Sequence, residues 1–473
     1  MIGRTVPRTV IPWQLPLPDS VGSDDYRHVL ARLYTYSEVP RTERAARLGR
    51  ERKLDRMRAL LDAAGNPQAR FQTILVAGTK GKGSMAAVLS SVLHAAGIRV
   101  GRYTQPHLYS HRERIWANGQ FITQHGLVEA FDSLRPAMSR IERNVDLLGP
   151  LTTFDAGTAL ALSHFSREHV EIAVVEVGVG GARDATNALE PTLSLIGPIG
   201  IDHSETLGTT IPAIAREKAG VMRRGVPVIS SHQVEEAAVV IRACARERDS
   251  RLYELGSEFF WETSREVPAN LTVRGRLGSV ERLSPPLSGR CQRDNLATAV
   301  MGALWLRQSG WRITDDDIRS GLGQVSWPGR FQTVVLDPLT IVDGAHNPAS
   351  ARALAETVVE CLPSRAVTLV VGMSVDKDAV ATLAELAPVV SRVVATRARH
   401  PRSYEPSRLA VIADGLGLPA TVEPNAEAAL QSAWAGLPPS GAVLVAGSLF
   451  LAGDVLEWLW RESGGCADNT AAT

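Results

Sequence analysis

The chain has 473 residues, 44% of them hydrophobic and 21% charged, which is enough for two or three domains with cores of their own. Lysine and arginine total 51 against 50 aspartates and glutamates, so no basic field favours nucleic acid or an acidic membrane. The four cysteines form no Cys-x-x-Cys pair, which excludes the common zinc and dithiol motifs and indicates free thiols. We expect a globular cytoplasmic protein with neither nucleic acid nor membrane as a partner.

The first 19 residues contain four prolines and lack the continuous apolar stretch of a secretory signal. Residues 25–64 carry recurring apolar positions that predict helices. Short apolar, β-branched runs then alternate with amphipathic segments. Such strands are buried on both faces, which predicts a mostly parallel sheet covered by helices. Strands are expected at 73–77, 100–104, 172–177, 193–201 and 226–230, and helices at 85–96 and 158–168.

The pattern changes at residues 251–287, where short alternating stretches predict antiparallel strands. A helix is expected at 295–308 and a linker at 323–329. We therefore predict an α/β domain of P-loop type over residues 1–327, with a short antiparallel region at about 251–288, and a smaller, Rossmann-like α/β domain over 328–473. The second domain has strands expected at 340–342, 367–371, 392–395 and 443–446, and helices at 350–361 and 377–386. The uncharged residues 431–453 are broken by prolines and glycines and predict a short strand, not a membrane span.

The most informative segment runs from the apolar strand at 73–77 into the turn Gly78-Thr-Lys-Gly-Lys-Gly-Ser and then into a helix. Its glycines let several backbone N–H groups point at one anion, and Lys82 and the helix N-terminus add positive potential. The predicted ligand is a nucleoside triphosphate. The segment departs from G-x-x-x-x-G-K-[ST], because Val76 replaces the first glycine and Gly83 follows the lysine. The alternative is a glycine turn with no ligand.

Acidic residues and a histidine follow two later strands. Glu176 ends one strand before a second glycine-rich turn, and Asp202 and His203 follow the next strand. A carboxylate at the carboxyl end of a parallel strand is well placed to hold magnesium over a nucleotide. The alternatives are a strand-terminal carboxylate at the surface and a histidine with a structural role.

Further motifs occur in a fixed order along the chain: Gln105-Pro-His-Leu, Thr152-Thr-Phe-Asp, Asp184-Ala-Thr-Asn, Arg216-Glu-Lys-Ala-Gly, Pro328-Gly-Arg-Phe-Gln, Asp343-Gly-Ala-His-Asn-Pro and Gly447-Ser-Leu-Phe-Leu. Together with the glycine turn, Glu176-Val-Gly-Val-Gly-Gly and Asp202-His203, they resemble folylpolyglutamate synthase and dihydrofolate synthase of the Mur ligase superfamily. The resemblance spans about residues 25 to 455. Many motifs in the right order are far more specific than any one of them.

The resemblance implies an ATP-dependent ligase that joins L-glutamate to tetrahydrofolate or its polyglutamates through an acyl phosphate, with dihydropteroate as a further acceptor. It implies a monomer that binds ATP and Mg²⁺. Lys82, His203 and Lys218 are the implied catalytic residues, and Lys218 matches a lysine that is often carbamylated. On composition alone, the segment around Lys218 is an ordinary solvated helix face. The implied magnesium ligands are Ser84, Gln105, Glu176 and His203.

The implied ATP contacts are Lys80, Gly81, Lys82, Gly83, Ser84, Asn295, Arg330, Asp343 and His346. Arg330 follows the linker, so its use would couple domain motion to catalysis; its alternative role is a linker salt bridge. The implied substrate contacts are Thr153, Phe154, Asp155, Arg183, Asp184, Lys377 and Arg402. Lys377 and Arg402 are candidates for the glutamate carboxylates, with ordinary surface charge as the alternative.

Several positions depart from the pattern of the family, among them Gly181-Ala-Arg-Asp, which stands where Gly-Arg-Leu-Asp is frequent. Gln105 stands where a magnesium-binding serine is common, and Thr153 and Asp155 replace a tyrosine and a glutamate that serve the dihydropterin. These departures keep two other functions open. One is a Mur-type ligase with another carboxylate acceptor, and the other is a nucleotide-binding regulatory protein without ligase activity. Retention of Lys82, Glu176, His203 and Lys218 together argues against the second.

Overall fold

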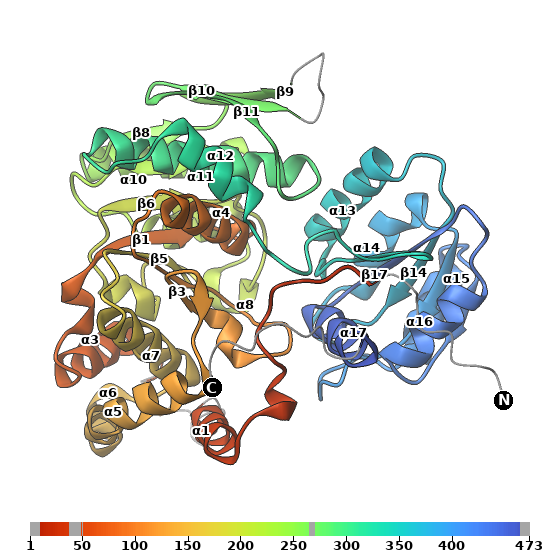
Figure 1. Cartoon of the computed structure of the whole chain (residues 1–473), viewed down its shortest axis with the longest axis horizontal. Coiled ribbons are helices and arrows are strands. Elements are labelled where there is room, and N and C mark those ends of the chain that lie inside the picture. Colours follow the sequence, from red (N-terminus) through yellow and green to blue (C-terminus); the bar gives the residue numbers. More distant parts are fainter. Residues whose placement is uncertain (1–9, 37–48, 50, 264–269, 464–473) are drawn as a thin grey trace. The chain divides into compact units, whose positions relative to one another are not determined.

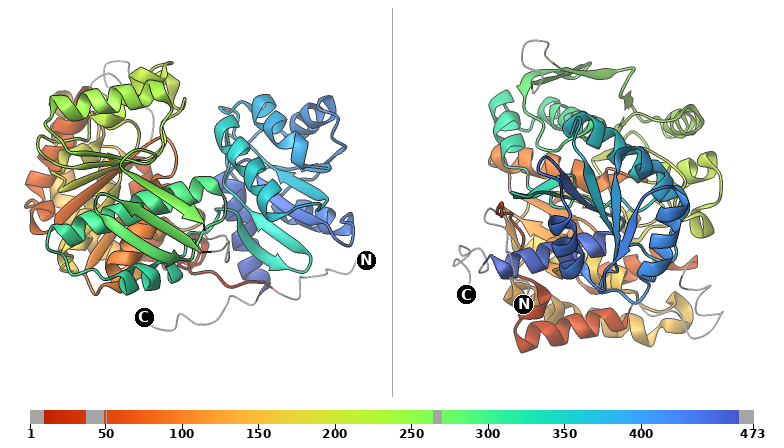
Figure 2. Two further views of the ribbon diagram at one scale, coloured as in Figure 1. Left: turned by 90° about the horizontal axis from the view of Figure 1, so that it is seen from above. Right: turned by 90° about the vertical axis from the view of Figure 1, so that its right-hand side faces the viewer.

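The structure is a computed structural model that describes residues 10–36, 49, 51–263 and 270–463. Its internal contacts divide the chain into two compact units (Figures 1 and 2). The larger comprises Asp19–Pro286 and Arg293–Val325, and the smaller comprises Leu287–Gln292, Ser326–Thr473 and the N-terminal arm up to Pro18. The division is less simple than a single boundary after residue 327. Two segments that precede this point lie with the smaller unit, because Val10 forms a β-bridge with Val335 and Gly289 packs against Thr357.

The sheet of the larger unit has eight described strands in the order β4-β3-β2-β5-β1-β6-β7-β8. The six strands from β2 to β8 in this order run parallel, whereas β3 and β4 pair antiparallel at one edge. The predicted parallel sheet is thus confirmed. The strand bounds are β1 Gln72–Ala77, β2 Val100–Tyr103, β3 Ile115–Ala117, β4 Gln120–Phe121, β5 Ile172–Glu176, β6 Leu193–Ile196, β7 Val228–Ser230 and β8 Leu252–Glu254.

Two strand predictions need correction. The strand expected at 193–201 ends at Ile196, because Pro198 has no N–H to continue the ladder. The stretch expected to begin the antiparallel region at residue 251 instead forms β8, which pairs parallel with β7. The antiparallel region that does form is a separate sheet of β9 Phe259–Thr263, β10 Leu271–Gly275 and β11 Gly278–Leu283.

Helices cover both faces of the large sheet (Figure 1). Successive strand residues face opposite sides, so Leu75 packs into one apolar core and Val76 into another. The first core contains α1 Asp24–Thr35, α3 Lys53–Ala63, α5 Gln124–Arg143 and α7 Thr153–Arg167, and the second contains α4 Lys82–Ala95, α11 Arg290–Gln308 and α12 Asp315–Gly323. A third cluster joins β6 and β7 to α9 Ile211–Ala219 and α10 Glu235–Glu247.

Helix α7 begins five residues earlier than expected, at Thr153. Thr152 and Asp155 form a capping box, in which each side chain accepts a hydrogen bond from the other's backbone N–H. Three predicted substrate contacts, Thr153, Phe154 and Asp155, therefore lie in the first turn of a helix.

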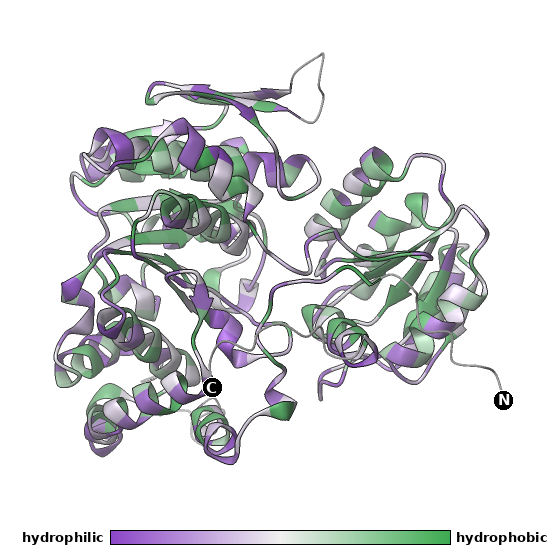
Figure 3. Ribbon diagram, in the orientation of Figure 1, coloured by the Kyte–Doolittle hydropathy of each residue, from purple (hydrophilic) through white to green (hydrophobic). Residues whose placement is uncertain are grey.

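The smaller unit has a sheet of six described strands in the order β12-β13-β17-β14-β15-β16, antiparallel only between β12 and β13. Figure 3 shows the apolar character of the strands in both sheets. The bounds are β12 Gln332–Leu336, β13 Leu339–Val342, β14 Val367–Val371, β15 Arg392–Ala395, β16 Ala420–Val422, β17 Ala442–Ala446, α13 Pro348–Cys361, α14 Ala379–Leu386, α15 Pro406–Gly415, α16 Ala426–Ala435 and α17 Leu449–Glu462. The helix expected from residue 377 starts at Ala379, since Asp378 is its N-cap. The second α/β fold is confirmed.

Two further observations bear on the sequence predictions. Within the part of the chain that the structure describes, no helix combines the length and hydrophobicity needed to cross a bilayer. Cys244 is a buried free thiol, whereas Cys466 lies outside the described residues.

A buried ion pair ties α3 to α7 beneath the large sheet. The Arg56 side chain is 1% exposed and its Nε donates to Oδ2 of Asp155, which is 0% exposed, at 2.8 Å. The two hydrogens of Nη1 are used as well, because Nη1 of Arg56 donates to the carbonyl oxygens of Gly49 and Leu148.

We expect Arg56→Ala to lower the free energy of unfolding by about 3–5 kcal/mol, because it leaves the Asp155 carboxylate buried without a countercharge. The matched control is Arg32→Ala, which removes a half-exposed partner of Glu142 and should cost less than about 1 kcal/mol. Urea unfolding followed by fluorescence and circular dichroism measures both. Equal losses in the two variants would show that burial does not set the strength of the Arg56 pair.

Candidate active site

The glycine turn between β1 and α4 is tightly enclosed. Gly78 and Gly81 have positive φ angles of 141° and 77°. A Cβ atom on Gly78 would lie 2.9 Å from Cα of Gly197, and one on Gly81 would lie 2.1 Å from Oδ1 of Asn295. Both the conformation and the space therefore require glycine at these two positions. The turn forms a backbone cradle directly before the N-terminus of α4.

Two lysines from different helices converge on one carbonyl of this turn. Nζ of Lys82, at the start of α4, donates to the Gly78 oxygen at 3.1 Å, and Nζ of Lys218, on α9, donates to the same oxygen at 2.9 Å. A third lysine, Lys80, pairs with Asp202 at 3.0 Å. Like charges that share one acceptor repel each other. The arrangement is suited to a polyanion that would neutralise them.

Lys218 is almost fully buried. Burial, followed by repulsion from Lys82, lowers the pKa of Lys218 from 10.5 to about 7. A large fraction of this side chain is therefore a neutral amine near neutral pH. The sequence pattern alone predicts a solvated helix face here, and the structure shows that α9 instead directs Lys218 into the turn.

Glu176 and Gln105 border the turn on the neighbouring strands. Glu176 ends β5 beside Val76 of β1, and its Oε1 lies 3.9 Å from Nζ of Lys82. The other oxygen of Glu176 accepts a hydrogen bond from the backbone N–H of Gln105 at 3.1 Å. Glu176 thus connects the glycine turn with the segment that follows β2.

His203 is farther along the same edge of the sheet. It is half exposed and has a φ of 51°, and its Nε2 lies 4.0 Å from Oδ1 of Asp202. Asp202 also pairs with Lys80, so His203 is connected to the turn through this carboxylate.

A magnesium ion would use few protein ligands here. Among the described residues, no group of three or more His, Cys, Asp or Glu side chains is placed to hold a metal ion. Mg²⁺ commonly takes one or two carboxylates and completes its shell with water and substrate phosphates. Ser84, Glu176 and His203 fit this limited role. Gln105 fits it less well, because its Nε2 faces Gly178, and an amide nitrogen does not ligate a cation.

The turn that follows β5 rests on the helix that carries Lys218. The backbone N–H of Ala182 donates to the Glu217 carbonyl at 2.7 Å, and the N–H of Arg183 donates to its Oε1 at 3.1 Å. A Cβ atom on Gly181 would lie 2.6 Å from that carbonyl, so the contact requires glycine. Glu217, which positions this turn against Lys218, was not among the site residues predicted from the sequence.

The predicted acceptor-binding residues divide into two groups. Phe154 and Asp184 lie together, because Nζ of Lys53 is 3.2 Å from Oδ2 of Asp184 and 5.2 Å from the Phe154 ring centroid. Lys53 was missed, since one lysine in a charged helical segment gives no signal. The prediction for Asp155 is corrected: this carboxylate is completely buried against Arg56 and is a structural residue.

Thr153 and Arg183 have local partners. The hydroxyl of Thr153 donates to the carbonyl of Leu33 at 2.8 Å, so it ties α7 to α1. The Arg183 side chain is largely exposed and reaches Oε2 of Glu217 at 3.5 Å.

In the smaller unit, Asp343 joins two loops. Its oxygens accept hydrogen bonds from the N–H groups of Phe331 and Ala345 at 2.8 and 2.7 Å. Burial raises the pKa of Asp343, although the Arg330 charge opposes the shift. Nη1 of Arg330 donates to the Gly329 carbonyl. Nδ1 of His346 lies 2.8 Å from the Gly344 carbonyl oxygen, so the three predicted nucleotide contacts share this loop pair.

Lys377 and Arg402 follow two adjacent parallel strands, β14 and β15. Their loops are joined, because the N–H of Val375 donates to the Arg402 carbonyl at 2.8 Å. Nζ of Lys377 lies 3.5 Å from Asp376. The structure therefore places both cations at one edge of the smaller sheet.

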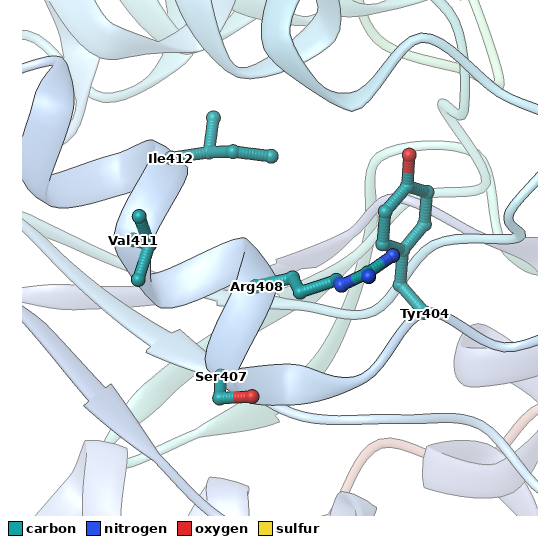
Figure 4. A pocket seen from close by; sticks show the side chains of 5 residues that line it. All are labelled: Tyr404, Ser407, Arg408, Val411 and Ile412. Atoms are coloured by element: carbon teal, nitrogen blue, oxygen red, sulfur yellow. The ribbon is translucent and has the colours of Figure 1, made fainter.

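A cavity of about 400 Å³ lies elsewhere in the smaller unit, on α15, and is lined by Tyr404, Ser407, Arg408, Val411 and Ile412 (Figure 4). It contains none of the predicted site residues. With one charged side chain and no backbone cradle, it lacks the groups that nucleotide binding requires. We therefore place the candidate site at the glycine turn.

Comparison with known proteins shows the family to which the chain belongs. Residues 329–449 match the family described as Mur ligase, glutamate ligase domain. The folylpolyglutamate synthase of Lacticaseibacillus casei is 35% identical over 347 residues, covering 72% of this chain and 79% of that protein. The dihydrofolate synthase/folylpolyglutamate synthase of Escherichia coli is 33% identical, with coverages of 82% and 87%.

Solved structures show the same fold. Mycobacterium tuberculosis folylpolyglutamate synthase complexed with ADP superposes with a TM-score of 0.83 at 29% identity, covering 92% of this chain and 98% of that one. Escherichia coli FolC in complex with DHPP and ADP has a TM-score of 0.81, with the same identity and coverages. The chain therefore belongs to the folylpolyglutamate synthase and dihydrofolate synthase family of ATP-dependent ligases within the Mur ligase superfamily.

Proposed function

We propose that this protein adds L-glutamate to tetrahydrofolate or its polyglutamates at the expense of ATP, and that it also converts dihydropteroate to dihydrofolate. The observation that carries the proposal is the glycine turn, where Lys82 and Lys218 share one carbonyl beside Glu176. Relatives with a similar fold are described in complex with ADP and with AMPPCP. We further propose a cytoplasmic monomer, with neither nucleic acid nor membrane as a partner.

The reaction requires an activated carboxylate, because a carboxylate is a poor electrophile. Attack of the acceptor carboxylate on the γ-phosphorus of ATP forms an acyl phosphate and releases ADP. The glutamate amine then attacks the acyl carbon, phosphate leaves, and the amine proton passes to solvent or a nearby base. Lys82 and the N–H groups at the start of α4 would offset charge on the transferred phosphoryl group.

Ser84, Glu176 and His203 are the residues that would hold magnesium, which when bound offsets phosphate charge. Lys218 would act as a carbamate. Carbon dioxide adds to a neutral amine, and a pKa of about 7 makes that form available near neutral pH. The carbamate converts a buried cation into an anion, which removes the repulsion between Lys218 and Lys82 and can serve as a further metal ligand.

The glycine turn of the larger unit would bind the phosphates of ATP, the same unit would bind the folate-type acceptor, and the smaller unit would bind L-glutamate. Phe154, Arg183 and Asp184 remain predicted acceptor contacts, as does Thr153, whose hydroxyl is engaged with α1. Lys377 and Arg402 remain predicted ligands of the glutamate carboxylates. The other predicted nucleotide contacts are Lys80, Gly81, Gly83, Asn295, Arg330, Asp343 and His346.

One observation favours a second candidate, a Mur-type ligase with a different carboxylate acceptor. Asp155 was expected to contact the pterin, yet it is buried against Arg56. An acceptor site without this carboxylate would suit other ring systems.

A substrate panel tests the proposed function. We expect ADP release that depends on both L-glutamate and either tetrahydrofolate or dihydropteroate, measured with a coupled assay and by mass spectrometry of the product. A muramoyl precursor should give no turnover. Turnover with the muramoyl compound alone would exclude the folate assignment and support the second candidate.

Lys218 should reduce stability when it is not carbamylated. We expect Lys218→Met to raise the free energy of unfolding by about 1–2 kcal/mol at pH 6.5 in buffer free of carbon dioxide, because it removes a buried cation. The Gly78 carbonyl keeps its bond from Lys82. Lys80→Met, which removes a partly exposed lysine of the same turn, is the control and should not stabilise.

The pH dependence has a definite sign. Below pH 7 Lys218 is charged in both states, so the cost of burying the cation is fully present. Between pH 7 and 10.5 the unfolded chain binds one more proton than the native protein, so native stability rises with pH. The advantage of Lys218→Met should therefore shrink across this interval in urea titrations. A constant advantage would contradict the lowered pKa.

The carbamate itself can be tested by chemical rescue. We expect Lys218→Ala to lower kcat by at least about 100-fold, and millimolar acetate or propionate to restore part of the activity by supplying a carboxylate in the vacated space. With ¹³C-bicarbonate, the unsubstituted protein should show a carbamate resonance that the variant lacks. Full activity in Lys218→Ala would refute the role.

A further inference from the structure

Three side chains meet above Gly178, two residues after the end of β5. A Cβ atom built on this glycine would lie 2.7 Å from Cζ of Phe154, 2.9 Å from Oδ2 of Asp184 and 3.1 Å from Nε2 of Gln105. An aromatic ring, a carboxylate and an amide thus converge on Gly178, and a residue with a Cβ atom would not fit between them. All four residues belong to the larger unit.

Asp184 has its hydrogen-bonding capacity filled by the protein. Its Oδ1 accepts from the N–H and the hydroxyl of Thr186 at 3.0 and 2.7 Å. Its Oδ2 accepts from the N–H of Val179 at 3.1 Å and from Nζ of Lys53 at 3.2 Å. The carboxylate is therefore held in place and neutralised, so it does not repel an electron-rich ligand beside it.

Gln105 differs from Asp184 in this respect. Its backbone is fixed, because its N–H donates to Oε2 of Glu176. Its Nε2, however, is buried and has no hydrogen-bond partner among the described residues. A buried donor without an acceptor is costly, and such a group in a native protein is commonly satisfied by a ligand or water. The nearby Asp184 oxygen favours the nitrogen end of the amide on this side.

We propose that Gln105 is a specificity-determining residue for the carboxylate acceptor. Its Nε2 donates a hydrogen bond to a ring nitrogen or carbonyl oxygen of a planar heteroaromatic group that packs beside Phe154. In a folate-type acceptor this group is the pteridine ring, so the inference rests on the proposed function. The departure from serine at position 105 then changes how the acceptor is recognised, and it does not supply a magnesium ligand.

Gln105→Glu separates the two roles of this residue. It preserves size but replaces the donor with an anion. If Gln105 donates a hydrogen bond to the acceptor ring, both Gln105→Glu and Gln105→Met should raise the KM for tetrahydrofolate. The expected increase is about 5- to 20-fold, the range expected for one lost hydrogen bond. The magnesium concentration for half-maximal activity should stay unchanged. If Gln105 binds the metal, Gln105→Glu should instead lower that concentration and leave the acceptor KM unchanged.

A truncated acceptor gives a second readout. p-Aminobenzoylglutamate lacks the pteridine ring, so its KM should be insensitive to all Gln105 variants. Binding of tetrahydrofolate in EDTA, followed by quenching of tryptophan fluorescence, should weaken in the same proportion as the KM rises. Gln124→Met is the control. Gln124 lies at the start of α5, where its Oε1 accepts an exposed hydrogen bond from the backbone N–H of Ser23, so the acceptor KM of this variant should equal that of the unsubstituted protein.

The outcomes distinguish the two levels of the proposal. Unchanged acceptor KM in folded Gln105→Met and Gln105→Glu, with normal turnover of tetrahydrofolate by the unsubstituted protein, overturns the inference and leaves the function intact. Equal loss with the truncated acceptor also overturns it, because the ring is then not the group recognised. Absence of folate turnover by the unsubstituted protein refutes the proposed function and the inference with it.

Discussion

The carbonyl oxygen of Gly78 accepts hydrogen bonds from two lysine side chains, and most of the site is arranged around this contact. Lys82 comes from the helix that follows the turn, and Lys218 comes from a helix about 140 residues later. Neither ammonium group is neutralised by the carbonyl alone. Burial and repulsion from Lys82 lower the pKa of Lys218 to about 7, and a polyanion at the turn would relieve this repulsion.

This contact explains why the surrounding backbone is so closely packed. Gly78 lies against Gly197 and Gly81 lies against Asn295, so the turn cannot widen to separate the two lysines. The turn that follows β5 is fixed to the Lys218 helix through Glu217. Since β1, β5 and β6 run parallel, their carboxyl ends deliver all these groups to one edge of the sheet. Rigid positioning of charge is what phosphoryl transfer requires of a protein.

Runs of apolar residues in the sequence predicted those strands whose residues are nearly all buried. The central strands are mostly apolar and almost completely buried, so β1, β5 and β14 were located to within a residue. The strands β3, β4 and β16 were missed, because each has only two or three residues, too few to show a pattern of its own, and depends on a neighbour for pairing. The start of α7 was predicted five residues too late. A capping box sets this helix end, and such a box depends on particular residues and not on apolar periodicity.

Site residues that lie within a recognisable sequence motif could be proposed as a group from the sequence. Residues whose role depends on contact with a distant part of the chain could not. The glycine turn and Glu176 are recognisable from their own segments. The burial of Asp155 was not, because it depends on Arg56, which lies 99 residues away. Lys53 likewise gains its place only by contact with Asp184, 131 residues later. The near-neutral pKa of Lys218 arises from burial, a property of the folded chain that the sequence of one helix does not encode.

A continuous set of contacts runs from the phosphate side of the site to the acceptor side. Lys218 and Lys82 share the Gly78 carbonyl, Lys82 lies beside Glu176, and Glu176 accepts the backbone N–H of Gln105. The Gln105 side chain then faces Phe154 and Asp184 above Gly178.

Gln105 therefore belongs to both sides, through its backbone on one and its amide on the other. The backbone contact with Glu176 does not depend on the side chain, so a serine at this position could keep it. Compared with serine, the glutamine adds a longer side chain whose amide would extend toward the acceptor. The departure from the serine that is common at this position would thus act on the recognition of the substrate and not on the metal site.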